Sequence, residues 1–220
     1  MIDDQGYFKE FPQPIFEASC KDHIDTVINH STPYYGPLLY WLVRCSSART
    51  ALEIGVCKAW TSYFLASGVK DNCTRNPGGG HYYGVDISGE LPELERKLRE
   101  KGLPVTMLQM DSWDIKPDTF PFAAKFGVIF IDGWHSAQHL FKEIELTWPL
   151  LEDKGKGYMV IHDVYGWVME PMQKILADPK YNAEVIRFED NYGLAIIRNM
   201  TNYTEDPKKT WPEGPQEDIK

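Results

Sequence analysis

Short apolar runs alternate along the chain with longer segments in which apolar and polar residues are mixed. The runs are rich in β-branched and aromatic residues and are bounded by polar or turn-forming residues, a pattern typical of buried strands. They occupy residues 50–54, 82–86, 105–109, 128–132 and 158–162. The intervening segments predict helices over residues 62–69, 90–101 and 137–151. Strands that alternate with helices at this spacing predict a parallel sheet that is covered on both faces.

The pattern changes near the C-terminus, where two strand-like runs follow each other without a helix between them. Residues 184–188 and 194–198 flank Glu189-Asp190-Asn191-Tyr192-Gly193, which has the length and composition of a hairpin loop. We therefore expect an α/β fold with a doubly wound, Rossmann-like and mostly parallel sheet, closed by an antiparallel C-terminal hairpin.

The segments outside the alternating pattern suggest a flap and a tail around a single domain. Residues 1–37 are polar and aromatic, end in a proline-bearing loop at 33–37, and are predicted to form an N-terminal flap. Residues 38–198 form the predicted domain, and residues 199–220 a polar C-terminal tail. The apolar helix expected at 38–43 is a candidate contact for a homo-oligomer.

The charge balance excludes some partners. The chain has 23 Lys and Arg against 32 Asp and Glu, a formal net charge of −9, which disfavours a protein that binds nucleic acid through its phosphates. No run approaches the roughly 20 apolar residues of a membrane-spanning helix. The opening is acidic where a secretory signal would be basic. These features predict a cytoplasmic protein with no membrane partner.

Candidate chemistry gathers where the predicted strands end, because ligands bind beyond the carboxyl ends of the strands in a doubly wound sheet. The first strand ends in a tight turn through Gly55 that leads into a helix, so backbone amides point over the turn. A small residue at position 59 allows a ligand to approach the backbone closely. The cofactor contacts predicted from this stretch are Glu53, Gly55, Ala59 and Ser62.

Acids at the ends of the second and third strands complete a predicted nucleoside pocket. Asp86 is placed to accept hydrogen bonds from both hydroxyls of a ribose, by analogy with dinucleotide-binding folds. Asp111 is a candidate acceptor for an adenine amino group, with Ser112 beside it and Trp113 covering the ring. Each feature alone is also compatible with a purely structural role, and their order and spacing carry the joint interpretation.

These residues resemble a known family. Glu53-Ile54-Gly55, Asp86, Asp111 and the terminal hairpin resemble the class I S-adenosylmethionine-dependent methyltransferases over about residues 38–198. The runs 131–136 and 160–164 look like the branch that contains macrolide and sugar O-methyltransferases and cephalosporin hydroxylase-like proteins. The resemblance implies S-adenosyl-L-methionine as cofactor and O-methylation of a small hydroxylated molecule such as a sugar, phenol or natural product. Ala59 stands where the family has a third glycine.

The resemblance also implies where the methyl group is transferred. In metal-dependent relatives, acids at the positions of Asp132, His162 and Asp163 hold a magnesium ion, so these three residues are the predicted metal ligands. His162 departs from that pattern, and an imidazole suits zinc, iron or nickel better than magnesium. The expected cofactor is therefore a divalent cation, Mg²⁺ or another metal, with Asp132 also contacting the S-adenosylmethionine.

A histidine is the candidate general base. His135 follows Asp132 by three residues, and its unperturbed pKa near 6.5 lies close to working pH. His135 and Asp132 are therefore the predicted catalytic residues. Two other interpretations stay open: His135 caps the following helix, and His162 is only a hydrogen-bonded residue at a strand end.

Alternative functions follow from the same residues. One is a metal-independent methyltransferase with a histidine base, and another is a nucleoside-binding accessory protein with weak or no catalysis. An NAD-dependent dehydrogenase is disfavoured, because the turn lacks the Gly-x-Gly-x-x-Gly pattern and the closing hairpin is foreign to that fold.

Overall fold

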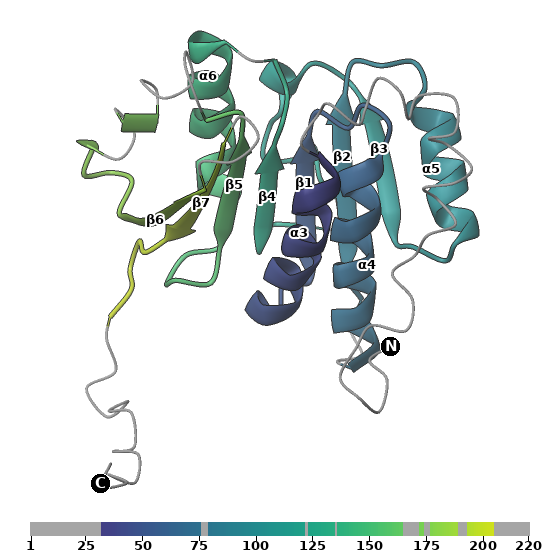
Figure 1. Cartoon of the computed structure of the whole chain (residues 1–220), viewed down its shortest axis with the longest axis horizontal. Coiled ribbons are helices and arrows are strands. Elements are labelled where there is room, and N and C mark those ends of the chain that lie inside the picture. The colour runs from purple at the N-terminus through teal and green to yellow at the C-terminus, as the bar shows by residue number, and fades with distance from the viewer. Residues whose placement is uncertain are drawn as a thin grey trace, which may run out of the picture.

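The computed structural model describes residues 32–75, 79–121, 123–134, 136–164, 172–173, 177–188 and 193–204. Its strands form one seven-stranded sheet in the order β3-β2-β1-β4-β5-β7-β6 (Figure 1). Their bounds are β1 (Thr50–Ile54), β2 (His81–Asp86), β3 (Val105–Gln109), β4 (Val128–Ile131), β5 (Tyr158–His162), β6 (Ala183–Phe188) and β7 (Leu194–Asn199). Neighbours among β1 to β5 are parallel, whereas β7 is antiparallel to both β5 and β6. The predicted fold class is confirmed.

Helices cover both faces of the sheet. α3 (Thr32–Ser46), α4 (Trp60–Arg75) and α5 (Leu91–Glu100) lie on one face, and α6 (Ala137–Thr147) with the short helix η2 (Trp148–Leu150) lies on the other (Figure 1). Successive side chains of a strand point to opposite faces. In β1, Ala51 therefore packs with the α3, α4 and α5 side, while Leu52 packs with the α6 side.

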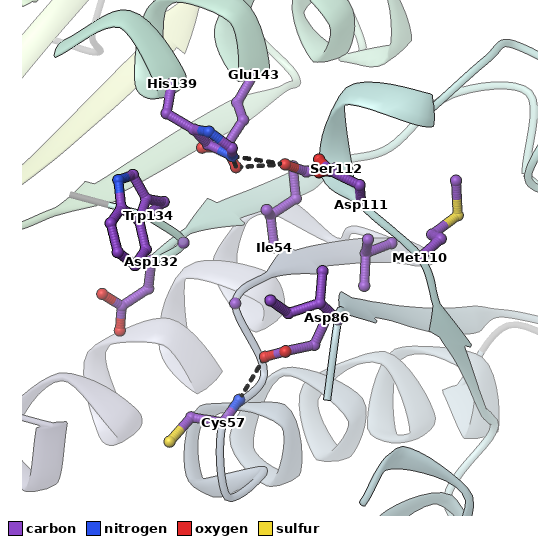
Figure 2. Close-up of a pocket in the computed structure, with 14 residues that line it drawn as sticks. Ile54, Cys57, Asp86, Met110, Asp111, Ser112, Asp132, Trp134, His139 and Glu143 are labelled. Atoms are coloured by element: carbon purple, nitrogen blue, oxygen red, sulfur yellow. Dashed lines mark hydrogen bonds and ion pairs between the residues drawn. The ribbon is translucent and has the colours of Figure 1, made fainter. Parts of the chain in front are cut away.

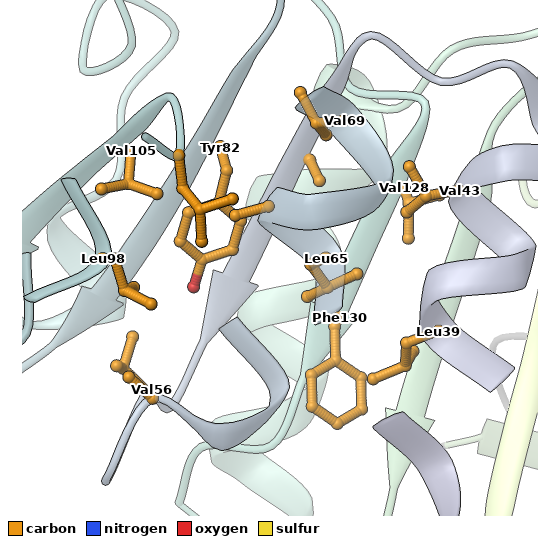
Figure 3. Packing of buried hydrophobic residues seen from close by; sticks show 14 of the residues in the cluster. Leu39, Val43, Val56, Leu65, Val69, Tyr82, Leu98, Val105, Val128 and Phe130 are labelled. Atoms are coloured by element: carbon orange, nitrogen blue, oxygen red, sulfur yellow. The ribbon is translucent and has the colours of Figure 1, made fainter. Parts of the chain in front are cut away.

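The packing of α3, α4 and α5 against the sheet is mainly apolar. Figure 3 shows Leu39 of α3 and Leu65 of α4 close to Phe130 of β4, with Tyr82 of β2 nearby. Each of these four side chains is fully buried or nearly so. Burying one such side chain contributes about 1.5–3 kcal/mol, so this layer fixes the central strands whose ends carry the candidate chemistry.

The predicted start of the helix at 38–43 was wrong. The helix expected at 38–43 is α3, which already begins at Thr32, so the predicted loop at 33–37 is helical and the proposed boundary at 37 falls inside a helix. Pro37 misled the prediction, because a proline inside a helix removes a backbone hydrogen bond and usually marks a break. Leu39 and Val43, in the segment predicted as an oligomer contact, are buried within the domain.

The helix predicted at 62–69 is also longer, because α4 continues to Arg75. Its last turns are polar, but Asn72 donates hydrogen bonds to the carbonyl oxygens of Val43 and Ala48 at 2.8 and 2.7 Å. These bonds tie the end of α4 to the end of α3. None of the helices in the described residues is long and apolar enough to cross a membrane.

Candidate active site

The turn after β1 is built around Gly55. Its φ of +87° lies in the region that favours glycine, and a Cβ at this position would collide with the carbonyl group of Asp132. The Gly55 amide donates to the carbonyl oxygen of Val85 at 2.9 Å, and the Asp132 amide donates to that of Ile54 at 2.8 Å. The ends of β1, β2 and β4 are thereby held together at the carboxyl edge of the sheet.

Ala59, which stands at the family's third glycine, also adopts a positive φ, of +60°. A left-handed conformation costs a residue with a side chain roughly 1–2 kcal/mol. Its amide donates to the Val56 carbonyl oxygen at 2.8 Å, and the Tyr63 amide donates to the Ala59 carbonyl oxygen at 3.2 Å. Ala59 is buried and does not line the cavity described below, so the structure gives it a part in shaping the turn.

Glu53 and Ser62 lie beneath this turn, away from the cavity. The buried carboxylate of Glu53 accepts hydrogen bonds from the hydroxyls of Ser62 (2.7 Å), Thr61 and Tyr82. The direct cofactor contacts predicted for Glu53 and Ser62 therefore find no support in the geometry, because both side chains are occupied in joining β1, β2 and α4. Thr61 and Tyr82 could not be recognised from the sequence as partners of Glu53.

Burial dominates the electrostatics of this cluster. It raises the pKa of Glu53 from its ordinary value of 4.5 to about 7, although the hydrogen bonds from Thr61, Tyr82 and Ser62 oppose the shift. The same burial, next to Glu53, raises the pKa of Tyr82 well above its ordinary value. Glu53 therefore releases its proton at a higher pH than an exposed carboxyl group does.

Asp86 lies at the end of β2, facing the turn. Its Oδ2 accepts hydrogen bonds from the backbone amides of Val56 and Cys57, both at 2.9 Å, and its Oδ1 accepts from the Ser88 amide at 2.9 Å. A carboxylate offers about four acceptor positions. Asp86 thus holds the turn and still borders the cavity, where a ligand hydroxyl can reach it.

A cavity of about 390 Å³ opens at this edge of the sheet (Figure 2). This volume lies within the usual range of roughly 300–1,000 Å³ for small-molecule sites. Five of the predicted site residues line it: Gly55, Asp86, Asp111, Ser112 and Asp132. Further lining residues that were not predicted as cofactor contacts are Ile54, Cys57, Val85, Ile87, Met110, Gly133, Trp134, His139 and Glu143.

Of the predicted cofactor contacts that follow β3, Asp111 and Ser112 line the cavity and Trp113 does not. Asp111 caps the short helix η1 (Ser112–Asp114), accepting a hydrogen bond from the Trp113 amide at 2.9 Å. The Trp113 ring stacks on His139 with centroids 4.8 Å apart, and it does not line the cavity. The prediction that Trp113 covers a ligand ring therefore lacks geometric support, because the face of Trp113 toward α6 is taken by His139.

Ser112 connects the cavity to α6. Its hydroxyl donates to Oε1 of Glu143 at 2.7 Å and lies 3.2 Å from Nε2 of His139. His139 and Glu143 are separated by one helical turn, so both side chains point from α6 toward the sheet edge (Figure 2). Glu143 could have been noticed as an acid among the apolar positions of its helix, next to Leu140 and Ile144.

The predicted metal ligands come together beside the cavity. Nδ1 of His162 lies 2.9 Å from Oδ1 of Asp132 and 3.2 Å from Oδ1 of Asp163, and one ligand atom from each residue falls within 4.8 Å of the others. Asp163 has a φ of +55°, an uncommon conformation that often marks functional positions. The ring of Tyr35, from α3, contacts His162 edge-on at 5.3 Å.

His135, the predicted general base, lies outside the described residues, and its role stays a prediction. Its neighbour Trp134 lines the cavity and is 73% exposed, the exposure of a side chain that is available to a ligand.

The parallel sheet with its reversed last strands, and a cavity at the carboxyl ends of β1, β2, β3 and β4, define a class I S-adenosylmethionine-dependent methyltransferase fold. A family model described as "Methyltransferase domain" matches residues 52–164, just over half of the chain. The chain belongs to this methyltransferase family, and it is an S-adenosylmethionine-dependent enzyme. The predicted enzyme class is confirmed.

Solved structures show the same fold at low sequence identity. The O-methyltransferase TomG from Streptomyces achromogenes, in complex with SAM, is 18% identical with a TM-score of 0.66, over 87% of this chain and 91% of that one. The SAH-bound methyltransferase PaMTH1 from Podospora anserina is 13% identical with a TM-score of 0.65, over 89% of each chain. An O-methyltransferase from Bacillus cereus in complex with SAH is 18% identical with a TM-score of 0.61, over 85% and 89%. Among curated proteins, no sequence matches this chain.

Proposed function

We propose that this protein transfers the methyl group of S-adenosylmethionine to a hydroxyl of a small molecule, with help from a divalent cation. The observation that carries the proposal is the position of Asp132, which both lines the cavity and belongs to the cluster with His162 and Asp163. A nucleoside site and a candidate metal site thus share one wall. The names of TomG and the Bacillus cereus protein, both O-methyltransferases, support an oxygen acceptor.

Different residues of the cavity would bind different parts of the cofactor. When bound, the cofactor supplies an electrophilic methyl group on its sulfonium. Asp86 is placed to accept from ribose hydroxyls, and Asp111 from an adenine amino group. Gly55 borders the cavity at the turn, where the amino-acid end would lie. The turn is supported by three residues outside the cavity, Ala59, Glu53 and Ser62.

The cluster of Asp132, His162 and Asp163 fits a divalent cation in its chemistry. It offers two carboxylates and one imidazole nitrogen, a set that suits zinc, iron, nickel or manganese as well as or better than magnesium. A bound cation would lower the pKa of an acceptor hydroxyl. Asp132 and Asp163, each partly exposed, and the buried His162 are the residues that would hold it.

A second candidate mechanism needs no metal. If Nδ1 of His162 carries the proton and donates to Asp132 at 2.9 Å, its Nε2 is left as a proton acceptor. His162, or His135 as the sequence predicts, would then take the proton of the acceptor hydroxyl. The acceptor in both candidates is a small molecule, since the charge of −9 disfavours a nucleic acid.

The test begins with calorimetric titration of S-adenosylhomocysteine, followed by methyl transfer to a panel of sugars, phenols and other hydroxylated molecules. We expect binding, transfer that a chelator abolishes, and recovery when a divalent metal is added back. Asp132→Ala and Asp163→Ala should each reduce the rate by at least about 100-fold. Asp118→Ala removes an exposed acid from a loop away from the cavity and is the matched control.

Three results would decide between the candidates. Full activity in the presence of chelator would favour the histidine base over the metal. Retained turnover with unchanged metal dependence in both variants would remove the metal assignment. No heat upon titration with S-adenosylhomocysteine would overturn the cofactor site itself.

A further inference from the structure

A buried acid borders the cavity at its α6 side and has no part in the reaction described so far. The side chain of Glu143 is only 1% exposed, yet it lines the cavity. Its Oε1 accepts a hydrogen bond from the Ser112 hydroxyl at 2.7 Å and lies 3.3 Å from Nε2 of His139 (Figure 2). A buried carboxylate is costly unless it is hydrogen-bonded, so its position beside a ligand cavity calls for a chemical reason.

The loop after β4 leaves room for this carboxylate. A Cβ added to Gly133 would lie 2.8 Å from Oε1 of Glu143 and 3.5 Å from Oε2. Any side chain at position 133 would therefore press on the acid. The glycine leaves space for the Glu143 carboxylate in the cavity wall, which Ser112 and Gly133 also line.

The neighbours of Glu143 hold it in one orientation. Ser112 and His139 both contact Oε1, while the Trp113 ring stacks on His139 and limits its movement. Asp111, next to Ser112, borders the same part of the cavity. This part of the wall therefore offers acidic acceptors, which suit a ligand that presents N–H donors.

We propose that Glu143, oriented by Ser112 and His139, selects a 6-aminopurine over a 6-oxopurine in the cofactor. The inference rests on the proposed cofactor site and deepens it. An exocyclic amino group carries two N–H donors, one for Asp111 and one for Glu143. A 6-oxo group instead turns an oxygen lone pair toward the carboxylate, and two facing acceptors repel each other.

The test compares binding of S-adenosylhomocysteine with that of S-inosylhomocysteine, which bears an oxygen at position 6 and a hydrogen on N1. Isothermal titration calorimetry of the unaltered protein should show at least about 10-fold tighter binding of the adenosyl compound. In Glu143→Gln, the amide can donate to a 6-oxo oxygen. The preference should then fall to about 3-fold or less, mainly because the inosyl compound binds better.

Glu145→Gln is the matched control, because it removes the same charge from an exposed position of the same helix. Its preference should equal that of the unaltered protein. Thermal unfolding of each variant shows whether the fold is intact, and the comparison in the unaltered protein does not depend on any variant.

Two outcomes overturn the inference while leaving the cofactor site standing. One is equal binding of both compounds by the unaltered protein, and the other is an unchanged preference in a folded Glu143→Gln. Failure of the unaltered protein to bind either compound would instead overturn the proposed function on which the inference rests.

Discussion

The carboxylate of Asp86 accepts a hydrogen bond from the backbone amide of Cys57 at 2.9 Å, across the turn that follows β1 (Figure 2). Cys57 has a φ of +48°, so this bond holds the turn in an uncommon conformation. The residue predicted to bind a ribose is therefore also a support for the turn that borders the same cavity. Substitutions at Asp86 should therefore affect both the conformation of the turn and the affinity for the ligand.

Asp86→Asn should weaken binding of S-adenosylhomocysteine by roughly 10- to 100-fold, because hydrogen bonds to a charged group are each worth about 1.5–3 kcal/mol. Three backbone amides now donate to the carboxylate, and the N–H groups of an asparagine side chain would face at least one of these donors. Calorimetry measures the affinity. Glu90→Gln, which removes an exposed charge bonded to Lys58 nearby, should leave affinity unchanged. Equal affinities for all three proteins would argue against a ribose contact.

Glu53 should make stability depend on pH. Its pKa is about 7 in the folded protein against an ordinary value of 4.5. Below about pH 4.5 both states hold the proton, and above it the unfolded state releases the proton first. The contribution of the protonated group to the free energy of unfolding is therefore lost as pH rises from about 4.5 through 7. Between pH 5 and 8 the loss should be roughly 2–3 kcal/mol.

Glu53→Gln isolates this effect, since an amide keeps hydrogen-bonding capacity without ionising. Urea unfolding across this pH range should show that the stability of the variant relative to the unaltered protein improves by roughly 2–3 kcal/mol toward pH 8. A constant difference between the two proteins would show that Glu53 keeps an ordinary pKa. Glu93→Gln, an exposed acid on α5, serves as a control for a surface carboxyl group.

Gly55→Ala should be one of the most damaging small substitutions in the chain. It combines a positive φ with a collision against the Asp132 backbone, which cannot move without disturbing β4. We expect a loss of more than about 3 kcal/mol of stability. Gly79→Ala has a similar φ of +71° but nothing within 4 Å of the added Cβ, so it should cost about 1 kcal/mol. Similar unfolding midpoints for the two variants would show that the collision is relieved.

Much of the fold could be predicted because most of the strands are short, mainly apolar runs that are bounded by polar or turn-forming residues. The parallel order and the closing hairpin followed from how those runs alternate with helices. The start of α3 could not be read from the local pattern, since Pro37, which lies inside this helix, is a loop signal. Packing of Leu39 against the sheet stabilises that helix.

The candidate site was predicted less completely. Positions at strand ends, such as Asp86 and Asp132, follow from topology, because parallel strands present their carboxyl ends at one edge. The direction in which a side chain points does not follow from topology. Glu53 precedes Gly55 by only two residues, yet its carboxylate points beneath the turn to Tyr82. Glu143 was missed because its partner Ser112 lies 31 residues away.

His162 is the residue that sets the proposed metal preference, and His162→Asp tests it. The change turns a cluster with one imidazole into three carboxylates, the oxygen donors that magnesium prefers. Without metal, three crowded acids should lower the unfolding midpoint, because like charges close together repel. Added Mg²⁺ should raise that midpoint more than it does in the unaltered protein.

The expected order of metals is therefore different in the two proteins. Calorimetric titration of metal-free protein should give tighter binding of Zn²⁺, Ni²⁺ or Fe²⁺ than of Mg²⁺ when His162 is present, since an imidazole suits these metals. His162→Asp should bind Mg²⁺ at least about 10-fold more tightly than the unaltered protein does. Asp118→Ala should keep the original order. If neither protein binds any divalent metal, the cluster acts through hydrogen bonds alone, and the 2.9 Å contact between His162 and Asp132 becomes the basis of proton transfer.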